Sequence, residues 1–384
     1  MRFEFATATR VLFGPGVLRD AGTAAREFGR HAFVVTGREP RRAEHLLDLL
    51  AAGDVAATTF ALAGEPTTDP VIAATAQARA AKCDLVVGFG GGSPLDAAKA
   101  VAALLTNHGG LLDYLEVIGR AQPLIHPAAP CVTIPTTAGT GAEVTRNAVL
   151  ASPAHQLKVS LRSSHMLPRL ALVDPELTHG LPPALTASTG LDALTQLIEP
   201  FVSSRANPLT DGLCAEGIRR AARSLRLAFH DGRCATARED MALASLFGGL
   251  ALANAGLGAV HGFAAPIGGM FPAPHGAVCA ALLAHVMAAN LQAARARLPG
   301  GETLRRYTEV AHLLTGDFTA TAEDGVRWVR ALVAELQIPG LRVYGVAAEH
   351  VSILVERAAQ ASSMKSNPLP LTAGELADIL MHSL

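Results

Sequence analysis

The sequence predicts an α/β domain built on a parallel sheet, followed by an all-helical domain. The chain has 384 residues, and a length of roughly 100 to 200 residues per domain suggests two domains. Short apolar runs alternate with helical patterns over about the first 155 residues. Beyond about residue 180 the strand-like runs largely stop, and long segments rich in Ala and Leu follow.

The strand-like runs of the first half have the character of strands that helices cover on both faces. Each run is short, apolar and bounded by glycine or polar residues. The predicted elements are strands in "HAFVVTG" (31–37), "DVAATTFAL" (54–62), "DLVVGFGGG" (84–92), "PCVTIPTT" (130–137) and "LALV" (170–173), with a helix in "RRAEHLLDLLAAG" (41–53).

The second half is predicted to consist of helices, and the boundary between the domains is placed before the helix opened by "LPPALTAST". We therefore expect one domain over residues 1–178 and another over 179–384. No low-complexity linker, repeat or charge block marks the join, so we expect a broad interface with a ligand cleft between the domains. The predicted helices include "ALASLFGGLALANAG", "LAHVMAANLQAARARL", "TLRRYTEVAHLL" and "GVRWVRALVAELQ".

Composition and charge exclude several classes of partner. Half of the residues are hydrophobic and only 17% are charged, with 32 basic and 33 acidic side chains and no basic run. Nucleic acid and an anionic membrane are therefore not expected partners. The N-terminus lacks the pattern of a signal peptide, no apolar run reaches the roughly 18 residues of a membrane span, and the five cysteines form no CxxC pair. We expect reduced thiols in a cytoplasmic protein.

A glycine-rich loop is the most informative stretch of the first half. In "DLVVGFGGGSPLDAAK" a predicted strand ends in three glycines and a helix follows. Ser93 is the expected N-cap, Pro94 the first helical residue and Asp96 the capping-box acid. Backbone N–H groups at such a helix start can approach a diphosphate closely. The loop matches neither GxGxxG nor GxxxxGK[ST], and the alternative is a tight turn alone. The glycines are Gly90, Gly91 and Gly92.

A second loop lies in "TIPTTAGTGAEVT", after the strand predicted at 131–134. It supplies Thr136, Thr137 and Thr140, whose small hydroxyl side chains can bond phosphate or ribose without crowding it. A threonine-rich turn without a ligand explains the same pattern equally well.

Four residues of the second half form a candidate metal site. In "GLDALTQLIEP" Asp192 and Gln196 stand one helical turn apart and share a face. His261 and His275 are separated by glycines and prolines, so we expect them on different elements, with His275 at a helix start. A carboxylate and two imidazoles suit iron or zinc, whereas an amide is a weak ligand. The alternative is that the histidines are hydrogen-bonded core residues.

Six segments together resemble the iron-containing (group III) alcohol dehydrogenase family, from about residue 10 to the C-terminus. The family includes alcohol and lactaldehyde-type reductases and a maleylacetate reductase branch. The resemblance implies a dehydroquinate synthase-like fold, NAD(P) bound by the α/β domain, metal and substrate bound by the helical domain, and a homodimer. The segments are "GGGSPLDAAK", "TIPTTAGTGAEVT", "VDPELTHGLPP", "TGLDALTQLIEPFVSSRANP", "GLGAVHGFAAPIGGMFPAPHGAV" and "SSMKSNPLPLT".

The metal site that the resemblance implies departs from the family at one ligand. The family uses an Asp, a His four residues later and two further His, which fall on Asp192, Gln196, His261 and His275. Gln196 replaces a histidine, so Fe²⁺ or Zn²⁺ is expected to bind weakly or not at all. A further family histidine, a proton relay near the nicotinamide, corresponds to Ala265 and is missing.

The cofactor residues also depart from the family. Members that use NAD often place an Asp at the position of Gly37, where the carboxylate bonds the ribose and repels a 2′-phosphate. Here Arg38 follows, with Arg41 and Arg42 close behind, which favours NADPH; the alternative is a solvated helix start. Lys158 corresponds to a lysine near the cofactor phosphates, or else is a surface lysine.

These observations predict an NAD(P)-dependent oxidoreductase that transfers hydride between nicotinamide and an alcohol/aldehyde or ketone pair. With metal bound, the site supplies a Lewis acid. Without metal, His261 or His275 acts as the general acid and Asp192 holds the imidazole. The alternatives are a metal-independent, maleylacetate reductase-like enzyme and a non-catalytic NAD(P)-binding protein.

Overall fold

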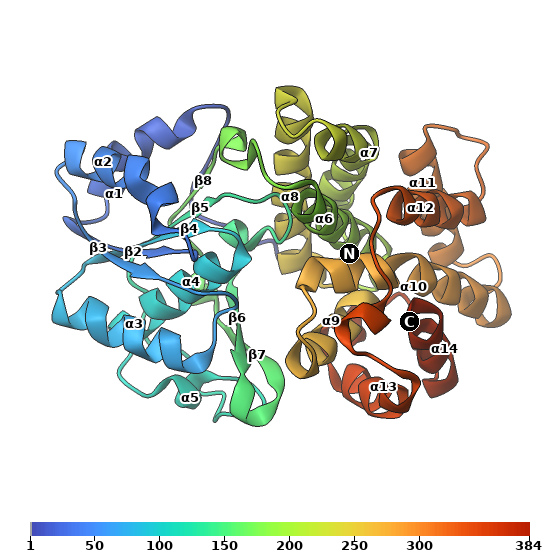
Figure 1. Cartoon of the computed structure of the whole chain (residues 1–384). Helices are drawn as coiled ribbons and strands as arrows, with labels where there is room; N and C mark the ends of the chain where they lie inside the picture. The colour runs from blue at the N-terminus through green and yellow to red at the C-terminus, as the bar shows by residue number, and fades with distance from the viewer. Residues whose placement is uncertain (1) are drawn as a thin grey trace. The chain divides into compact units, whose positions relative to one another are not determined.

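The computed structural model describes residues 2–384 and contains two compact units (Figure 1). One, called here the α/β unit, comprises Ala6–Thr137 and Gly141–Thr178. The other, called the helical unit, comprises His179–Leu384 together with Ala138–Thr140 and the N-terminal residues up to Phe5. A short piece of the second predicted phosphate loop therefore belongs to the helical unit.

The α/β unit is built on a six-stranded sheet in the order β1-β8-β5-β4-β2-β3, and every pairing in it is parallel. The chain adds β3 on one side of β2 and β4 on the other, so the strand order reverses between β2 and β4. Ligands of such sheets bind beyond the carboxyl ends of the strands at this reversal. The strands are β1 Val11–Phe13, β2 His31–Thr36, β3 Ala56–Ala61, β4 Leu85–Gly90, β5 Cys131–Pro135 and β8 Leu170–Val173.

Helices cover both faces of this sheet (Figure 1). Alternate residues of β2 face opposite ways, as in any strand. Ala32 and Val34 belong to one apolar cluster with α1 and α2, whereas Phe33 and Val35 belong to another with α3, α4 and α5. The helices are α1 Ala21–Arg26, α2 Glu44–Ala52, α3 Thr68–Ala80, α4 Gly92–Thr106 and α5 Leu111–Tyr114.

An antiparallel hairpin lies outside the main sheet. Strand β6, Asn147–Ser152, pairs with β7, Leu157–Arg162. Its inward residues, such as Leu150 and Val159, join the α3/α4 cluster. The sequence analysis did not predict this hairpin or β1, because β1 is three residues long and the hairpin alternates apolar with polar residues.

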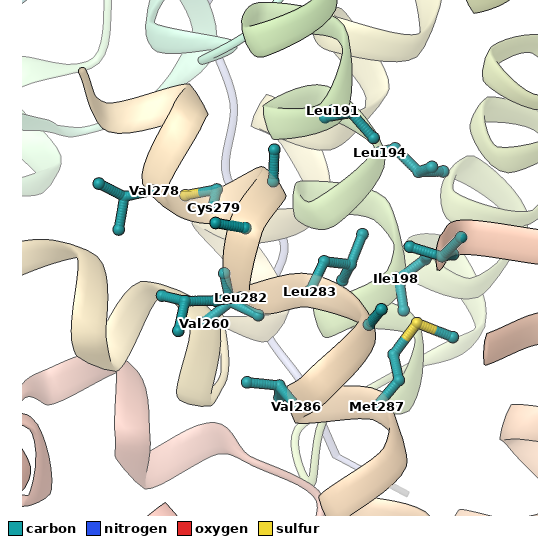
Figure 2. Close-up of a cluster of buried hydrophobic side chains, with 14 of the residues drawn as sticks. Leu191, Leu194, Ile198, Val260, Val278, Cys279, Leu282, Leu283, Val286 and Met287 are labelled. Carbon is teal, nitrogen blue, oxygen red and sulfur yellow. The ribbon is translucent and has the colours of Figure 1, made fainter. Parts of the chain in front are cut away.

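The described part of the helical unit contains helices and no strand, which confirms the predicted fold class. Its main apolar cluster joins α6, α7, α8, α9 and α10, and Figure 2 shows Leu191, Leu194 and Ile198 of α6 with residues of α10. The helices are α6 Pro183–Val202, α7 Pro208–His230, α8 Ala235–Ala255, α9 Ala259–Met270, α10 His275–Arg297, α11 Glu302–Thr315, α12 Ala322–Glu335, α13 Val351–Gln360 and α14 Ala373–Ser383.

Helix α10 is long and apolar enough, by length and composition, to cross a membrane. However, 72% of its most apolar window is buried within the protein. Residues such as Leu282, Leu283 and Met287 pack in the main apolar cluster (Figure 2). The helix is therefore apolar because it forms the core of the helical unit.

Candidate metal centre

Helix α6 places Asp192 and Gln196 one turn apart on a buried face. Their side chains are almost fully buried, with 1% and 2% of the residue surface exposed. Gln196 Nε2 donates a hydrogen bond to the Gly139 carbonyl at 3.3 Å. Gly139 belongs to the short stretch of the second predicted phosphate loop that packs in the helical unit.

The two histidines reach Asp192 from two further helices. His261 lies in the first turn of α9, and His275 is the first residue of α10, after the Pro274 N-cap. Their Nε2 atoms lie 3.5 Å and 3.7 Å from Asp192 Oδ1, respectively. Two imidazoles and a carboxylate from three helices therefore converge on one point, although the residues are up to 83 positions apart in the chain.

Two buried oxygens of this cluster lack a hydrogen-bond partner, namely Asp192 Oδ1 and Gln196 Oε1. Buried polar atoms are nearly always satisfied, so an orphaned pair calls for an explanation such as an absent ion. Imidazole nitrogens and a carboxylate are suitable ligands for a divalent metal. The residues present thus fit a divalent metal ion.

Glu199 is a residue of the candidate site that the sequence analysis missed. Its Oε2 lies 2.6 Å from His261 Nδ1, and its Oε1 accepts a hydrogen bond from the Val260 N–H at 2.7 Å. A carboxylate on Nδ1 fixes the ring orientation and leaves Nε2 free to bind a metal. The available signal was spacing, because Glu199 follows Asp192 by seven residues and so shares its helical face.

Cys279 is the second residue that the sequence analysis missed. It lies on α10 one turn after His275, and Figure 2 shows its side chain beside Val278. The sulfur is 3.8 Å from His261 Nε2 and 3.7 Å from His275 Nε2. The single ligating atoms of Asp192, His261, His275 and Cys279 all lie within 4.8 Å of one another. The available signal in the sequence was again spacing, because Cys279 follows His275 by four residues and so shares its helical face.

The electrostatics of the cluster favour charged side chains despite burial. Burial alone opposes ionisation of Asp192, but the neighbouring His275 and His261 lower the pKa of its carboxyl below the usual value. Burial likewise opposes protonation of His261, yet Cys279, Glu199 and Asp192 raise the pKa of His261 well above its usual value. In the same way Cys279 and Asp192 outweigh burial and raise the pKa of His275.

In the α/β unit, the predicted phosphate cradle lies at the carboxyl ends of β4, β5 and β2. The Thr136 N–H donates to the Gly90 carbonyl at 2.9 Å. A Cβ on Gly91 would lie 3.2 Å from Thr137 Oγ1, and one on Gly37 would lie 3.9 Å from Cγ of Pro94. The strand order reverses at this edge of the sheet, which is the expected place for a dinucleotide. The residues that lie there are Gly37, the three glycines and two of the threonines.

Glycine is required at the first position of the cradle. Gly90 has φ +151°, and a Cβ there would lie 2.6 Å from Cγ of Pro94. The chain thus turns sharply from β4 into α4, and the N–H groups at the start of α4 lie directly after the end of β4.

Three predictions about this loop are wrong in detail. The N-cap of α4 is Gly91 and the helix begins at Gly92, so Ser93 lies inside the first turn and makes no capping bond. Three glycines allow the helix to start earlier than the Ser-Pro signal indicates. Asp96 is no capping-box acid, because its carboxylate binds Lys99 at 2.9 Å and accepts the Val149 N–H at 2.9 Å.

The remaining predicted cofactor residues are spread over the chain. Thr140 packs with the helical unit and not with Thr136 and Thr137. Lys158 lies on β7 of the hairpin, where its Nζ is 2.6 Å from Glu65. Arg38 is exposed at the end of β2. Arg41 and Arg42 are also exposed, in the short turn before α2.

Comparison with known proteins gives matches over nearly the whole chain. A family model described as iron-containing alcohol dehydrogenase matches residues 8–175, and the C-terminal model of the same family matches residues 186–384. Alcohol dehydrogenase 4 of Schizosaccharomyces pombe is 38% identical over 79% of this chain and 69% of that protein. The 1,3-propanediol dehydrogenase of Klebsiella pneumoniae is 34% identical over 99% of this chain and 98% of its own.

Solved structures agree with these matches. A crystal structure of 1,3-propanediol oxidoreductase superposes with a TM-score of 0.93 at 32% identity, covering 100% of both chains. A sulfoacetaldehyde reductase from Bifidobacterium kashiwanohense, crystallised in complex with NAD⁺, has a TM-score of 0.86 at 26% identity, covering 100% of this chain and 99% of that one.

Proposed function

The chain belongs to the iron-containing alcohol dehydrogenase family, and we propose that it is a metal-assisted, NAD(P)-dependent enzyme that interconverts small alcohols with aldehydes or ketones. The observation that carries this proposal is the convergence of His261 and His275 on Asp192, whose Oδ1 has no hydrogen-bond partner. The relative named a 1,3-propanediol dehydrogenase makes short diols and their aldehydes the first substrates to test.

The metal would be held by Asp192, His261 and His275. When bound, a divalent ion supplies a Lewis acid that polarises the substrate oxygen and stabilises negative charge on it during hydride transfer. Glu199 holds His261 through Nδ1 and thereby orients Nε2 toward the site. The side chain of His275 is 36% exposed, in contrast to 7% for His261, so the cluster opens on the side of His275.

The cofactor would bind at the carboxyl ends of β2 and β4. The backbone at Gly91 and Gly92 would bind the diphosphate at the start of α4, together with Thr136 and Thr137. Gly37 has no carboxylate that would repel a 2′-phosphate and leaves space at this position. The neighbouring Arg38 is exposed and carries a positive charge. Both features support NADPH as the cofactor. In this proposal residues 1–178 bind the cofactor and residues 179–384 bind metal and substrate.

At position 265 an alanine stands where a proton-relay histidine is expected from the family. It lies on α9 one turn after His261 and has no group that can exchange a proton. The proton that accompanies carbonyl reduction would therefore come from water or a substrate hydroxyl on the open side of the cluster. A homodimer in the cytoplasm remains part of the prediction.

The test is a hydride-transfer assay on anaerobically purified protein. NADH and NADPH oxidation would be followed with short aldehydes, 3-hydroxypropanal and maleylacetate, before and after chelation, and metal content would be measured in parallel. We expect aldehyde reduction that chelation abolishes and added metal restores. Aldehyde reduction by metal-free protein would contradict the metal-assisted mechanism. Selective consumption of maleylacetate by metal-free protein would establish the metal-independent alternative, and cofactor binding without any turnover would establish the non-catalytic one.

A further inference from the structure

The metal cluster contains a fourth strong donor that neither the family resemblance nor the proposed function assigns. Cys279 is fully buried, and its sulfur faces the Nε2 atoms of both histidines at 3.7 Å and 3.8 Å. A single buried cysteine is ordinarily an inert core residue. Here, however, it lies beside the unpartnered Oδ1 of Asp192, which is 1% exposed and belongs to the same cluster.

The spacing of the four donor atoms matches a tetrahedral coordination shell. Zinc binds sulfur at about 2.3 Å and nitrogen or oxygen at about 2.0 to 2.2 Å, so neighbouring donors in a tetrahedron lie roughly 3.3 to 3.6 Å apart. Four of the six separations between the donor atoms of Asp192, His261, His275 and Cys279 are 3.5, 3.7, 3.7 and 3.8 Å, and the other two are at most 4.8 Å. Small movements of these side chains would therefore complete the shell.

Gln196 is the weaker candidate for the fourth position. Its Nε2 is held by the Gly139 carbonyl, and its Oε1, although it also lacks a hydrogen-bond partner, is a neutral oxygen and thus a weak ligand. Replacing an imidazole by this amide removes a good ligand, whereas a thiolate at Cys279 adds a stronger and softer one. One carboxylate and one thiolate also balance the charge of a divalent ion, which favours binding in a buried site.

We infer that Cys279 is the fourth metal ligand, in place of the side chain at position 196, and that this donor set selects zinc over iron. On binding, the S–H bond breaks, the proton leaves to solvent and a sulfur–metal bond forms. Thiolate ligands favour zinc, whereas harder oxygen and nitrogen sets discriminate less. Zinc accepts a fifth ligand during catalysis, and the exposed side of His275 leaves room for one. This inference rests on the proposed function, because it assumes a metal at this cluster.

The decisive measurement reports the sulfur–metal bond directly. Wild-type protein would be loaded with Co²⁺ and its absorption recorded, because thiolate ligation gives an intense sulfur-to-cobalt charge-transfer band in the near ultraviolet in addition to the visible bands. X-ray absorption of the zinc-loaded wild type would be measured beside it. We expect the charge-transfer band and one sulfur scatterer at about 2.3 Å. A shell of nitrogen and oxygen alone would overturn the inference, and this measurement needs no variant.

Variants test the assignment to Cys279. Cys279→Ser and Cys279→Ala should lose the charge-transfer band and bind zinc at least about tenfold more weakly, by analogy with the loss of a ligand-orienting group. Cys214→Ala is the matched control, since Cys214 is equally buried and lies on α7 outside the cluster; it should keep the band. Persistence of the band in both Cys279 variants would overturn the inference.

Two outcomes separate this inference from the proposed function. If the activity of wild type needs metal but its cobalt spectrum lacks the sulfur band, the proposed function stands and the role of Cys279 is overturned. Protein that reduces aldehydes without metal and binds no Co²⁺ overturns both. In a mixture of Zn²⁺ and Fe²⁺ under anaerobic conditions we expect wild type to retain zinc, and a preference for iron would overturn the selectivity.

Discussion

Each unit of the molecule buries a polar cluster, and the two clusters differ in how completely their hydrogen bonds are made. In the α/β unit the fully buried Lys99 ammonium has three donors and three partners, at 2.8 Å to Ala142 O, 2.8 Å to Thr145 Oγ1 and 2.9 Å to Asp96 Oδ1. In the helical unit Asp192 Oδ1 and Gln196 Oε1 have no hydrogen-bond partner, although the Nε2 atoms of His261 and His275 lie 3.5 and 3.7 Å from Oδ1.

The difference suggests a role for each cluster, with the closed one supporting the fold and the open one suited to a ligand. A buried network whose members satisfy one another fixes the chain, and Lys99 ties α4 to the turn at residues 142–145. A buried cluster left incomplete costs stability unless something else completes it. We therefore expect changes at Lys99 to affect unfolding and changes at Asp192 to affect metal and activity.

The largest expected effect is that of Asp192→Asn. Removing the carboxylate while keeping its shape should lower kcat/KM at least about 10³-fold, because Lewis-acid stabilisation is worth several kcal/mol and each 1.4 kcal/mol is a factor of ten. The free energy of unfolding of metal-free protein should change less than in Lys99→Met, since Oδ1 makes no hydrogen bond and the loss of its charge lowers the tendency of His261 and His275 to be protonated. Steady-state kinetics, metal analysis and urea unfolding would measure this, with exposed Asp378→Asn as control. Full activity in Asp192→Asn would contradict the assignment of the open cluster to metal binding and activity.

Lys99→Met should show the opposite pattern. It leaves Asp96 and two oxygen acceptors without their buried partner, which should cost about 3 to 5 kcal/mol in the free energy of unfolding. Metal content should stay at the wild-type level at temperatures where the variant is folded. The check is urea unfolding, with exposed Lys82→Met as a control expected within about 0.5 kcal/mol of wild type. An unchanged unfolding midpoint for Lys99→Met would mean that the closed network does not support the fold.

Glu143, beside Lys99, gives the closed cluster a pH dependence. Burial raises the pKa of Glu143 to about 7 from 4.5, although a hydrogen bond from its own backbone and the Lys99 charge act in the opposite direction. The protonated carboxyl is thus favoured in the folded state, and its contribution is complete below about pH 4.5 and lost as pH rises through 7. This shift corresponds to about 3 kcal/mol.

Glu143→Gln should therefore reduce the loss of unfolding free energy between pH 4.5 and 8 by about 3 kcal/mol relative to wild type. Urea unfolding across this range measures the slope. Exposed Glu176→Gln, in the same unit, should leave the slope unchanged. Identical slopes for wild type and Glu143→Gln would show that the carboxyl ionises freely in the folded protein.

Glu199→Gln tests how the open cluster is held. The amide can still bond one neighbour but no longer places a charge on His261 Nδ1, now 2.6 Å from the carboxylate. Metal affinity should fall roughly 10 to 100-fold, as for other groups that orient metal ligands. Competition with a chromophoric chelator gives the affinity, and thermal unfolding of the metal-free form separates positioning from general damage. A lowered melting temperature with unchanged affinity would contradict the positioning role.

The smallest effect concerns the cofactor. Gly37→Asp places a carboxylate in open space at the end of β2, where the nearest atom to a Cβ is 3.9 Å away. We expect the preference for NADPH over NADH, measured as a ratio of kcat/KM values, to fall by about tenfold through repulsion of the 2′-phosphate. Gly37→Asn is the uncharged control. An equal effect of both variants would show that the size of the side chain, and not its charge, determines the preference between NADPH and NADH.

The sequence was most informative where the signal is local. Strands β2, β3, β4 and β5 lie where the apolar runs of the sequence place them. This is because the period and length of an apolar run depend on neighbouring residues alone. The start of α4 was misplaced by two residues, since Gly91 caps it without a side chain. The hairpin at 147–162 was missed because alternating polar residues disguise its buried face.

By itself the sequence determined the fold class, the family, the glycine loop and three residues of the candidate metal cluster, because each follows from local periodicity or from motifs in order along the chain. Only the tertiary structure decided that Glu199 supports His261, that Cys279 faces both histidines and that Gln196 is tied to Gly139. The physical reason is that a ligand shell assembled from three helices depends on how those helices pack. Spacing along one helix shows which side chains share a face, and packing alone decides what that face meets.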